Sequence, residues 1–531
     1  MAELVNLTID GRAVSVPKGT NLIEAARLAG IDIPYYCYHP HLSVAGNCRM
    51  CQVKVEGQPK LTIACNTGAT EGMVVKTQHS APEVENAQRA TLEFLLINHP
   101  LDCTVCDQAG HCKLQDYYYE YNTQPSRFIE DKQHKVKAEV LGPEVIYDGE
   151  RCIVCTRCSR FCEEVTKTSE LGVFNRGDKS VISVFPGREL NNPLSGTVVD
   201  LCPVGALTHR RWRFNTRIWY TNQKNSVCAG CSTGCNVNVA VRDGKIVHVK
   251  GRLNSSVNQE WMCDEGRYGF NRFQPEARAA GASVRTGSAL APSTIDAALQ
   301  AASALAGTGN DAAMFLSPLL TLEEGWVALQ FAEKVMGITP GSGRIAMQIR
   351  TRELTPVEAV LVSPDYAANA RAATVLGLID GQLQDWRKIL QAQYQNLLNQ
   401  IRKEGVKRLL FVGDFSLLED DVDAELRAAL ESAATVVAIS PRVPSAGGVE
   451  RFAHVFFPGR TANEKGGIYV NGSGRLQRVR ALLDPPFGTF PEWLTLEKIA
   501  RAAKRALLPA EAIDERALFR TMVQAVPALK G

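Results

Sequence analysis

The sequence predicts a multidomain protein in which small α+β domains, each built around a group of cysteines, precede a larger α/β domain. Two observations predict this order. All sixteen cysteines stand at or before position 263, and they form four closely spaced groups. From about position 310 onward, short apolar runs of strand length alternate with helical patterns. This alternation predicts a parallel sheet with helices on both faces.

The cysteine spacing favours iron–sulfur clusters over two alternatives. A disulfide between cysteines as close as Cys152 and Cys155 would be strained, and the N-terminal sequence MAELVNLTID lacks the features of a secretory signal. Structural zinc sites favour two CxxC pairs. Two of the groups instead place three cysteines in one short loop and a fourth far downstream, which is typical of a [4Fe–4S] ligand set. Several such centres in series indicate electron transfer.

Length and charge exclude some other classes. A chain of 531 residues is long enough for four or five domains. The net charge of +3 provides no field that would favour nucleic acid. No apolar run approaches the roughly 20 residues that span a bilayer, so we expect membrane contact only through other subunits.

Residues 1–80 predict a β-grasp ferredoxin domain. Alternating apolar residues over 5–17 indicate a hairpin that turns at Asp10-Gly11, and a helix over 21–28 ends near Gly30. A cysteine loop, the strand QVKV and a late cysteine follow. This order is typical of a [2Fe–2S] ferredoxin. The expected ligands are Cys37, Cys48, Cys51 and Cys65.

Residues 81–120 contain a predicted helix over 85–97 and then only three cysteines, Cys103, Cys106 and Cys112. A [4Fe–4S] cluster needs four ligands, so either the fourth is not a cysteine or the cluster has three irons. His99 stands four residues before the first cysteine, and imidazole does ligate iron. His111 adjoins Cys112, and consecutive residues rarely point at one centre. The pattern therefore favours His99.

Residues 140–217 resemble a bacterial two-cluster ferredoxin that has kept one cluster. The run CIVCTRCSRFC is followed by Cys202-Pro203, but the other positions of the second half are Asn192, Ser195 and Val198. The ligands expected for the remaining [4Fe–4S] cluster are Cys152, Cys155, Cys158 and Cys202. Cys162 has lost its partners, and we expect a buried, inert thiol there.

Residues 221–277 predict a small β-rich domain with another [4Fe–4S] cluster, and a hairpin that turns at Asp243-Gly244. The expected ligands are Cys228, Cys231, Cys235 and Cys263. Residues 278–531 predict the α/β domain. Its expected strands are 311–317, 357–363, 407–414 and 435–440, and its expected helices are 321–336 and 421–433. The GSG at 472–474 lacks a Walker lysine, so we expect an ordinary turn.

The order of these domains resembles the family of the large iron–sulfur subunit of bacterial NADH:quinone oxidoreductase, respiratory complex I. Residues 1–277 carry the resemblance through HPLDCTVCDQAGHCKLQD, ERCIVCTRCSRFC and DLCPVGAL. The fourth group and the tail, with GRTANEKGGIYVNGSGRLQ, resemble the molybdopterin oxidoreductases. The tail has only 254 residues after position 277, so the resemblance implies a shortened, degenerate domain without molybdopterin.

The resemblance implies that the chain relays electrons through one [2Fe–2S] and three [4Fe–4S] clusters toward quinone, with no complete active site of its own. It implies that His99, Cys103, Cys106 and Cys112 hold one [4Fe–4S] cluster. It also implies FMN and NADH on a flavoprotein partner, a small thioredoxin-like [2Fe–2S] subunit, and connecting and quinone-site subunits. The expected location is the cytoplasmic side of the bacterial inner membrane. An electron-transfer subunit of an NAD-linked hydrogenase or a formate dehydrogenase is the alternative.

Overall fold

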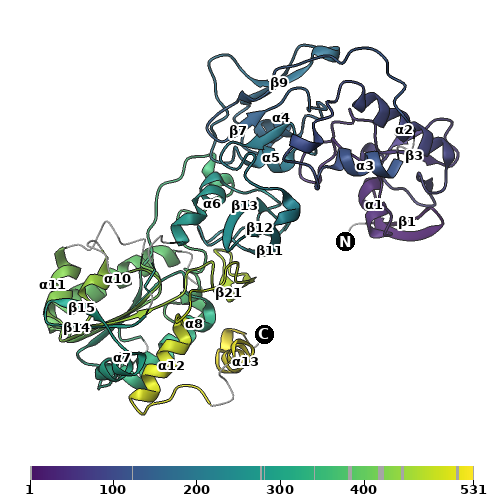
Figure 1. The fold of residues 1–531 in the computed structure, drawn as a ribbon. Coiled ribbons are helices and arrows are strands. Elements are labelled where there is room, and N and C mark those ends of the chain that lie inside the picture. Colours follow the sequence, from purple (N-terminus) through teal and green to yellow (C-terminus); the bar gives the residue numbers. More distant parts are fainter. Residues whose placement is uncertain are drawn as a thin grey trace. The chain divides into compact units, whose positions relative to one another are not determined.

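The computed structural model describes residues 3–121, 124–274, 278–279, 281–339, 341–380, 385–415, 424–443, 448–509 and 514–529. The chain divides into two compact units, Met1–Asn222 and Gln223–Gly531 (Figure 1). Within the described ranges, no helix combines the length and the apolar composition that crossing a bilayer requires.

The first unit begins with a five-stranded sheet in the order β2-β1-β5-β3-β4. Its strands are β1 (Leu4–Ile9), β2 (Arg12–Pro17), β3 (Gln52–Val55), β4 (Thr62–Ile63) and β5 (Val74–Lys76). The hairpin predicted over 5–17 is confirmed, because β1 and β2 pair antiparallel around Asp10 and Gly11, which have φ values of 45° and 78°. The helix α1 (Leu22–Leu28) is capped by the Asn21 side chain, which accepts a hydrogen bond from Glu24.

Two helices follow this sheet in the chain, α2 (Pro82–Leu96) and α3 (Lys113–Tyr121). The helix predicted over 85–97 is therefore confirmed, but it begins three residues earlier. Pro82 explains the difference, since its fixed φ and missing N–H suit the first turn of a helix.

The rest of the first unit contains a three-stranded sheet in the order β10-β7-β6, a hairpin of β8 and β9, and two short helices. Their bounds are β6 (Glu139–Val140), β7 (Val145–Tyr147), α4 (Arg157–Glu164), β8 (Leu171–Phe174), β9 (Val181–Val184), α5 (Thr197–Leu201) and β10 (Leu207–His209).

The second unit opens with a three-stranded antiparallel sheet, β11-β12-β13, followed by a short helix. These elements are β11 (Asn222–Val227), β12 (Asn236–Arg242), β13 (Lys245–Gly251) and α6 (Asp264–Tyr268). β12 and β13 turn at Asp243 and Gly244, as predicted.

A seven-stranded sheet in the order β15-β14-β20-β19-β18-β16-β17 forms the centre of the second unit. Its strands are β14 (Ser283–Thr286), β15 (Ala289–Pro292), β16 (Ala312–Leu316), β17 (Ile345–Met347), β18 (Arg408–Val412), β19 (Thr435–Ser440) and β20 (Val455–Pro458). The five strands from β20 to β17 are parallel, whereas β14 pairs antiparallel with β20 and with β15.

Helices cover both faces of this sheet, as predicted (Figure 1). They are α7 (Ile295–Ala302), α8 (Leu322–Phe331), α9 (Ala372–Val375), α10 (Trp386–Glu404), α11 (Ala424–Ser432), α12 (Glu492–Ala502) and α13 (Glu515–Ala525). In β16, Met314 and Leu316 pack in one apolar core and Ala313 and Phe315 pack in another. Alternate side chains thus fill two separate cores.

The strand predicted over 357–363 is wrong. A short 3-10 turn, Glu358–Val360, stands there, and the edge strand is β17 instead. The reason is local, because Thr355 and Glu358 form reciprocal side-chain to backbone hydrogen bonds that favour a helical turn. The other predicted strands are confirmed. Of the helix predicted over 421–433, residues 421–423 lie outside the described residues.

The GSG at 472–474 lies in the turn between β21 (Gly467–Val470) and β22 (Leu476–Val479), so the prediction of an ordinary turn is confirmed. Gly474 has a φ of 84°, and the backbone N–H of Gly472 donates to the carbonyl of Ser232. This contact joins the hairpin to the loop that carries Cys231 and Cys235.

Candidate iron–sulfur cluster sites

The first group of cysteines lies in the loop between α1 and β3 and in the 3-10 turn Ala64–Asn66. Cys37, Cys51 and Cys65 are buried, and the backbone N–H of Cys37 donates to the Cys48 sulfur at 3.5 Å. A hydrogen bond between the two sulfurs lowers the pKa of Cys37 to about 5, and the contact with Cys51 lowers the pKa of Cys65 in the same way. The four sulfurs therefore interact as two close pairs.

The second group lies between α2 and α3. Cys103 begins a 3-10 turn and is exposed, whereas Cys106 and Cys112 are buried. Gly205, from the following domain, packs so closely that a Cβ there would lie 2.1 Å from the Cys106 sulfur. The structure thus places a glycine of a distant segment directly against this site.

His99 follows α2 and is half-buried, while His111 is exposed. Burial lowers the pKa of His99 to about 4, and the positive charges of Arg151 and Lys132 act in the same direction. A neutral imidazole is the form that ligates a metal. Arg151 also interacts with Cys106, so His99 and this cysteine share a cationic neighbour.

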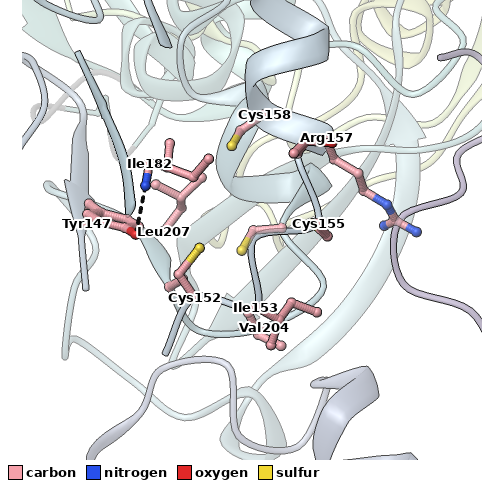
Figure 2. Close-up of a pocket in the computed structure, with 12 residues that line it drawn as sticks. Tyr147, Cys152, Ile153, Cys155, Arg157, Cys158, Ile182, Val204 and Leu207 are labelled. Atoms are coloured by element: carbon pink, nitrogen blue, oxygen red, sulfur yellow. Dashed lines mark hydrogen bonds between the residues drawn. The ribbon is translucent and has the colours of Figure 1, made fainter. Parts of the chain in front are cut away.

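The third group surrounds a cavity in the first unit. Figure 2 shows the sulfurs of Cys152, Cys155 and Cys158 facing this common space, and Cys202 also lines it. The rest of the lining comes from Tyr147, Ile153, Thr156, Arg157, Ile182, Val204, Ala206 and Leu207. All four thiols expected to act together therefore meet at one cavity, which is mostly apolar.

The backbone of this loop is strained in a way that serves the sulfur. Val154 has a φ of 49°, which is rare for a β-branched residue. In this conformation its N–H donates to the Cys152 sulfur at 3.4 Å. N–H donors of this kind stabilise a thiolate.

Cys162 does not line the cavity. It is fully buried on α4, and burial raises the pKa of its thiol to about 12, with Glu170 acting in the same direction. Glu170 accepts hydrogen bonds from the backbone N–H groups of Asn191 and Asn192. Ser195 and Val198, the other residues at the substituted ligand positions, are buried too. Side chains therefore fill the region where a second ferredoxin cluster would need its ligands.

The fourth group lies in the second unit, before β12 and at the start of α6. The backbone N–H groups of Gly230 and Gly266 donate to the sulfurs of Cys228 and Cys263, at 3.4 and 3.3 Å. A Cβ at Gly266 would lie 3.2 Å from one of these sulfurs and 3.3 Å from the other. Both sulfurs thus face the same glycine.

The chemistry of these sites fits iron–sulfur clusters. Burial raises the pKa of Cys202 to about 12 and that of Cys228 to about 11, and neighbouring sulfurs add to the effect. Several buried thiols with N–H donors would be costly as free thiolates, but cations at the centre reverse this cost. The donor sets are sulfur-rich, as clusters require.

Three residues at these sites were missed from the sequence. Tyr147 lines the third cavity, and Arg157 and Arg160 flank Cys158 on α4. The only signal in the sequence is two arginines inside a cysteine-rich helix, and a surface helix could carry the same pattern.

Comparison with known families gives one consistent picture. The 2Fe-2S iron-sulfur cluster binding domain matches residues 2–80, the NADH-ubiquinone oxidoreductase-G iron-sulfur binding region 88–127, the ferredoxin-like domain of NADH-quinone oxidoreductase subunit 3 142–208, the molybdopterin oxidoreductase Fe4S4 domain 221–274, and molybdopterin oxidoreductase 287–502.

Curated relatives agree over the first half of the chain. A subunit of the NADH-quinone oxidoreductase of Streptomyces coelicolor is 40% identical over 62% of this chain and 39% of that protein. The NADH-ubiquinone oxidoreductase 75 kDa subunit of Reclinomonas americana is 42% identical over 50% of this chain and 38% of that protein. The chain therefore spans about two fifths of the length of these relatives.

A solved NAD+-reducing [NiFe]-hydrogenase chain is 26% identical to this chain and covers 40% of it and 91% of its own length, with a TM-score of 0.34. That score is too low to support a comparison of whole folds.

The fold and the matched domains define an iron–sulfur protein of the oxidoreductase class, in which 2Fe-2S and 4Fe-4S domains precede a molybdopterin oxidoreductase-type domain. More particularly, the chain is a relative of the large iron–sulfur subunit of NADH-quinone oxidoreductase. The predicted fold class is thereby confirmed.

Proposed function

We propose that this chain is an electron-relay subunit of NADH:quinone oxidoreductase, passing electrons from a flavoprotein partner toward quinone. The observation that carries the proposal is the cavity lined by Cys152, Cys155, Cys158 and Cys202, in a chain whose iron–sulfur domains match those of this enzyme family. Sulfur ligands from one loop and from a distant cysteine meet there, as a [4Fe–4S] cluster requires.

The proposal assigns sixteen ligands to four clusters. They are Cys37, Cys48, Cys51 and Cys65 for a [2Fe–2S] cluster, and His99, Cys103, Cys106 and Cys112, then Cys152, Cys155, Cys158 and Cys202, then Cys228, Cys231, Cys235 and Cys263 for three [4Fe–4S] clusters. When bound, such clusters accept and release single electrons. The proposal keeps the domain limits 1–80, 81–120, 140–217, 221–277 and 278–531.

The residues of the chain bind and shield these centres. Buried cysteines such as Cys106 and Cys158 keep water away from the ligand sulfurs, because little of their surface is exposed. Backbone N–H groups such as that of Val154 stabilise the negative charge on the sulfurs. Nothing in these sites abstracts or donates a proton, so we assign no catalytic residue.

The remaining assignments concern partners. NADH donates two electrons as hydride, so a flavin must separate them first, and we place this FMN on a partner. The proposed partners are the NADH-binding flavoprotein, the thioredoxin-like [2Fe–2S] subunit, and the connecting and quinone-site subunits. The proposed location is the cytoplasmic side of the inner membrane, as a peripheral part of a membrane complex.

Co-purification from native membranes, followed by identification of the bound subunits, tests the proposal. Respiratory subunits should accompany the chain, and NADH oxidation should require the flavoprotein. Hydrogenase subunits would favour the hydrogenase alternative. Formate oxidation by the chain alone, with stoichiometric molybdenum, would contradict the proposal.

A further inference from the structure

Two buried arginines on α4 join the loop of the first cysteine group to that of the third. Arg160 Nη2 donates to the carbonyl oxygen of Cys37 at 2.6 Å and to that of Cys155 at 3.4 Å. One guanidinium nitrogen thus contacts the backbone of a cysteine from each group. Arg160 Nη1 donates to the carbonyl of Ser43, also in the first loop.

Arg157 makes a second bridge of the same kind. Its Nη1 donates to the carbonyl of Leu201, next to Cys202, at 3.2 Å, and its Nη2 donates to the carbonyl of Tyr38, next to Cys37. Figure 2 shows the guanidinium of Arg157 directed away from the sulfurs that face the cavity. This arginine therefore contacts the backbone behind the ligands and leaves the cavity to the thiols.

Two further contacts join the same loops. Asn47 Nδ2 donates to the carbonyl of Val154 at 3.2 Å, and the backbone N–H of Ser43 donates to a carboxylate oxygen of Glu164 at 2.7 Å. All of these contacts lie within the first unit, between segments more than 100 residues apart in sequence. The two loops are therefore held together by several polar contacts.

The charge balance of the bridge points to anions nearby. Arg157 and Arg160 are buried, and among the described residues neither guanidinium has a carboxylate partner within ion-pair distance. Two buried cations with only neutral carbonyl partners are costly. Clusters held by four thiolates carry net negative charge, so clusters in both neighbouring groups would balance these cations.

We propose that Arg157 and Arg160 are positioning residues that fix the first and third cluster sites next to each other and balance the charge of both. The inference rests on the proposed function, and it assigns the direct passage of a single electron to this pair of sites. No bond forms or breaks in that passage and no proton moves. The arginines hold the spacing and raise the potentials of both centres, because positive charge favours the reduced state.

Two substitutions separate geometry from charge. Arg160→Gln removes the cation and the fork, whereas Arg160→Lys keeps the cation but cannot make the same set of bonds. Arg12→Gln is the matched control, because Arg12 also donates to backbone carbonyls in the first unit, those of Ala29 and Gly30, but contacts neither cysteine loop.

The readouts are iron content, the midpoint potentials of both centres by EPR-monitored redox titration, and amide hydrogen exchange at Ser43 in the full chain. Arg160→Gln should keep its iron, lower both potentials, and speed exchange at Ser43 about tenfold or more, as expected for the loss of charge-assisted hydrogen bonds. Arg160→Lys should speed exchange but leave the potentials close to those of the wild type. Arg12→Gln should change neither.

Unchanged potentials and unchanged exchange in Arg160→Gln, with both centres present, would overturn this inference and leave the proposed function intact. A wild-type chain that lacks either centre would overturn both. If Arg160→Gln does not accumulate as folded protein, exchange at Ser43 in Arg160→Lys decides the positioning role, and an unchanged rate there overturns it.

Discussion

The hydroxyl oxygen of Tyr147 accepts a hydrogen bond from the backbone N–H of Ile182 at 3.1 Å (Figure 2). Because this N–H occupies the acceptor side, the phenolic proton can donate elsewhere. The Cys152 sulfur is its partner, since the two side chains line the same cavity and their hydrogen bond affects the pKa of both groups. Ile182 thus orients Tyr147 toward a proposed cluster ligand.

Tyr147→Phe should lower the midpoint potential of the third centre, because hydrogen bonds to ligand sulfurs raise the potential of a cluster. The ring and its packing remain, so iron content should not change. EPR-monitored redox titration measures the effect. Tyr118→Phe is a suitable control, since Tyr118 is 41% exposed on α3 and does not line the cavity. An unchanged potential in Tyr147→Phe would show that this hydroxyl does not tune the centre.

Cys162→Ala and Cys202→Ala should behave differently, although both thiols are shielded from solvent. Cys162→Ala should keep all its iron and lose about 1 kcal/mol of stability from the small cavity that it leaves. Cys202→Ala removes a proposed ligand, so about four irons per chain should be lost. Elemental analysis of the two purified variants makes the comparison. The opposite pattern would contradict the single-cluster interpretation of residues 140–217.

His99→Cys should retain its cluster at a lower potential, because a thiolate adds negative charge where a neutral imidazole stood. His111→Ala should leave that cluster in place, since His111 is exposed. EPR of the reduced proteins tests both statements. Loss of the signal in His111→Ala, together with an unaffected His99→Ala protein, would reverse the assignment.

Lys465 in the second unit lies between two buried carboxylates. Its Nζ contacts Glu324 at 3.1 Å and Glu492 at 2.9 Å. Burial opposes the charged ammonium, but the two carboxylates raise the pKa of Lys465, and burial raises the pKa of Glu492 well above its ordinary value. Lys465→Met would leave this acidic pair without its cation.

We expect Lys465→Met to destabilise the second unit by about 3–5 kcal/mol. Hydrogen exchange of the buried amides of β18 measures the loss within this unit. Lys388→Met is the control, because Lys388 pairs with Asp385 in an exposed position at 3.7 Å and should cost less than about 1 kcal/mol. Equal effects in the two variants would show that the buried pair contributes no more than a surface pair.

Local signals explain what could be predicted of the fold. Asp10-Gly11 specifies a tight turn, and Thr321 with Glu324 forms the capping box that begins α8. The error at 357–363 has the same origin, because the cap at Thr355 and Glu358 is a helical signal inside an apolar run. Turn and cap residues therefore decide the local structure where an apolar run alone is ambiguous.

The candidate ligands could also be proposed from spacing, because cysteines in one loop must converge by geometry. The residues around them could not. Arg160 reaches Cys37 across 123 positions of the sequence, and Gly205 packs against Cys106 only because two domains of the first unit meet there. No periodicity or motif encodes such contacts, so only the folded chain reveals them.

Elemental analysis of the full chain, purified without exposure to oxygen, tests the central claim most directly. The proposal of one [2Fe–2S] and three [4Fe–4S] clusters predicts about fourteen irons per chain and no stoichiometric zinc. About ten irons in intact protein would contradict the cluster at Cys228, Cys231, Cys235 and Cys263. Zinc in place of iron would contradict the electron-relay account as a whole.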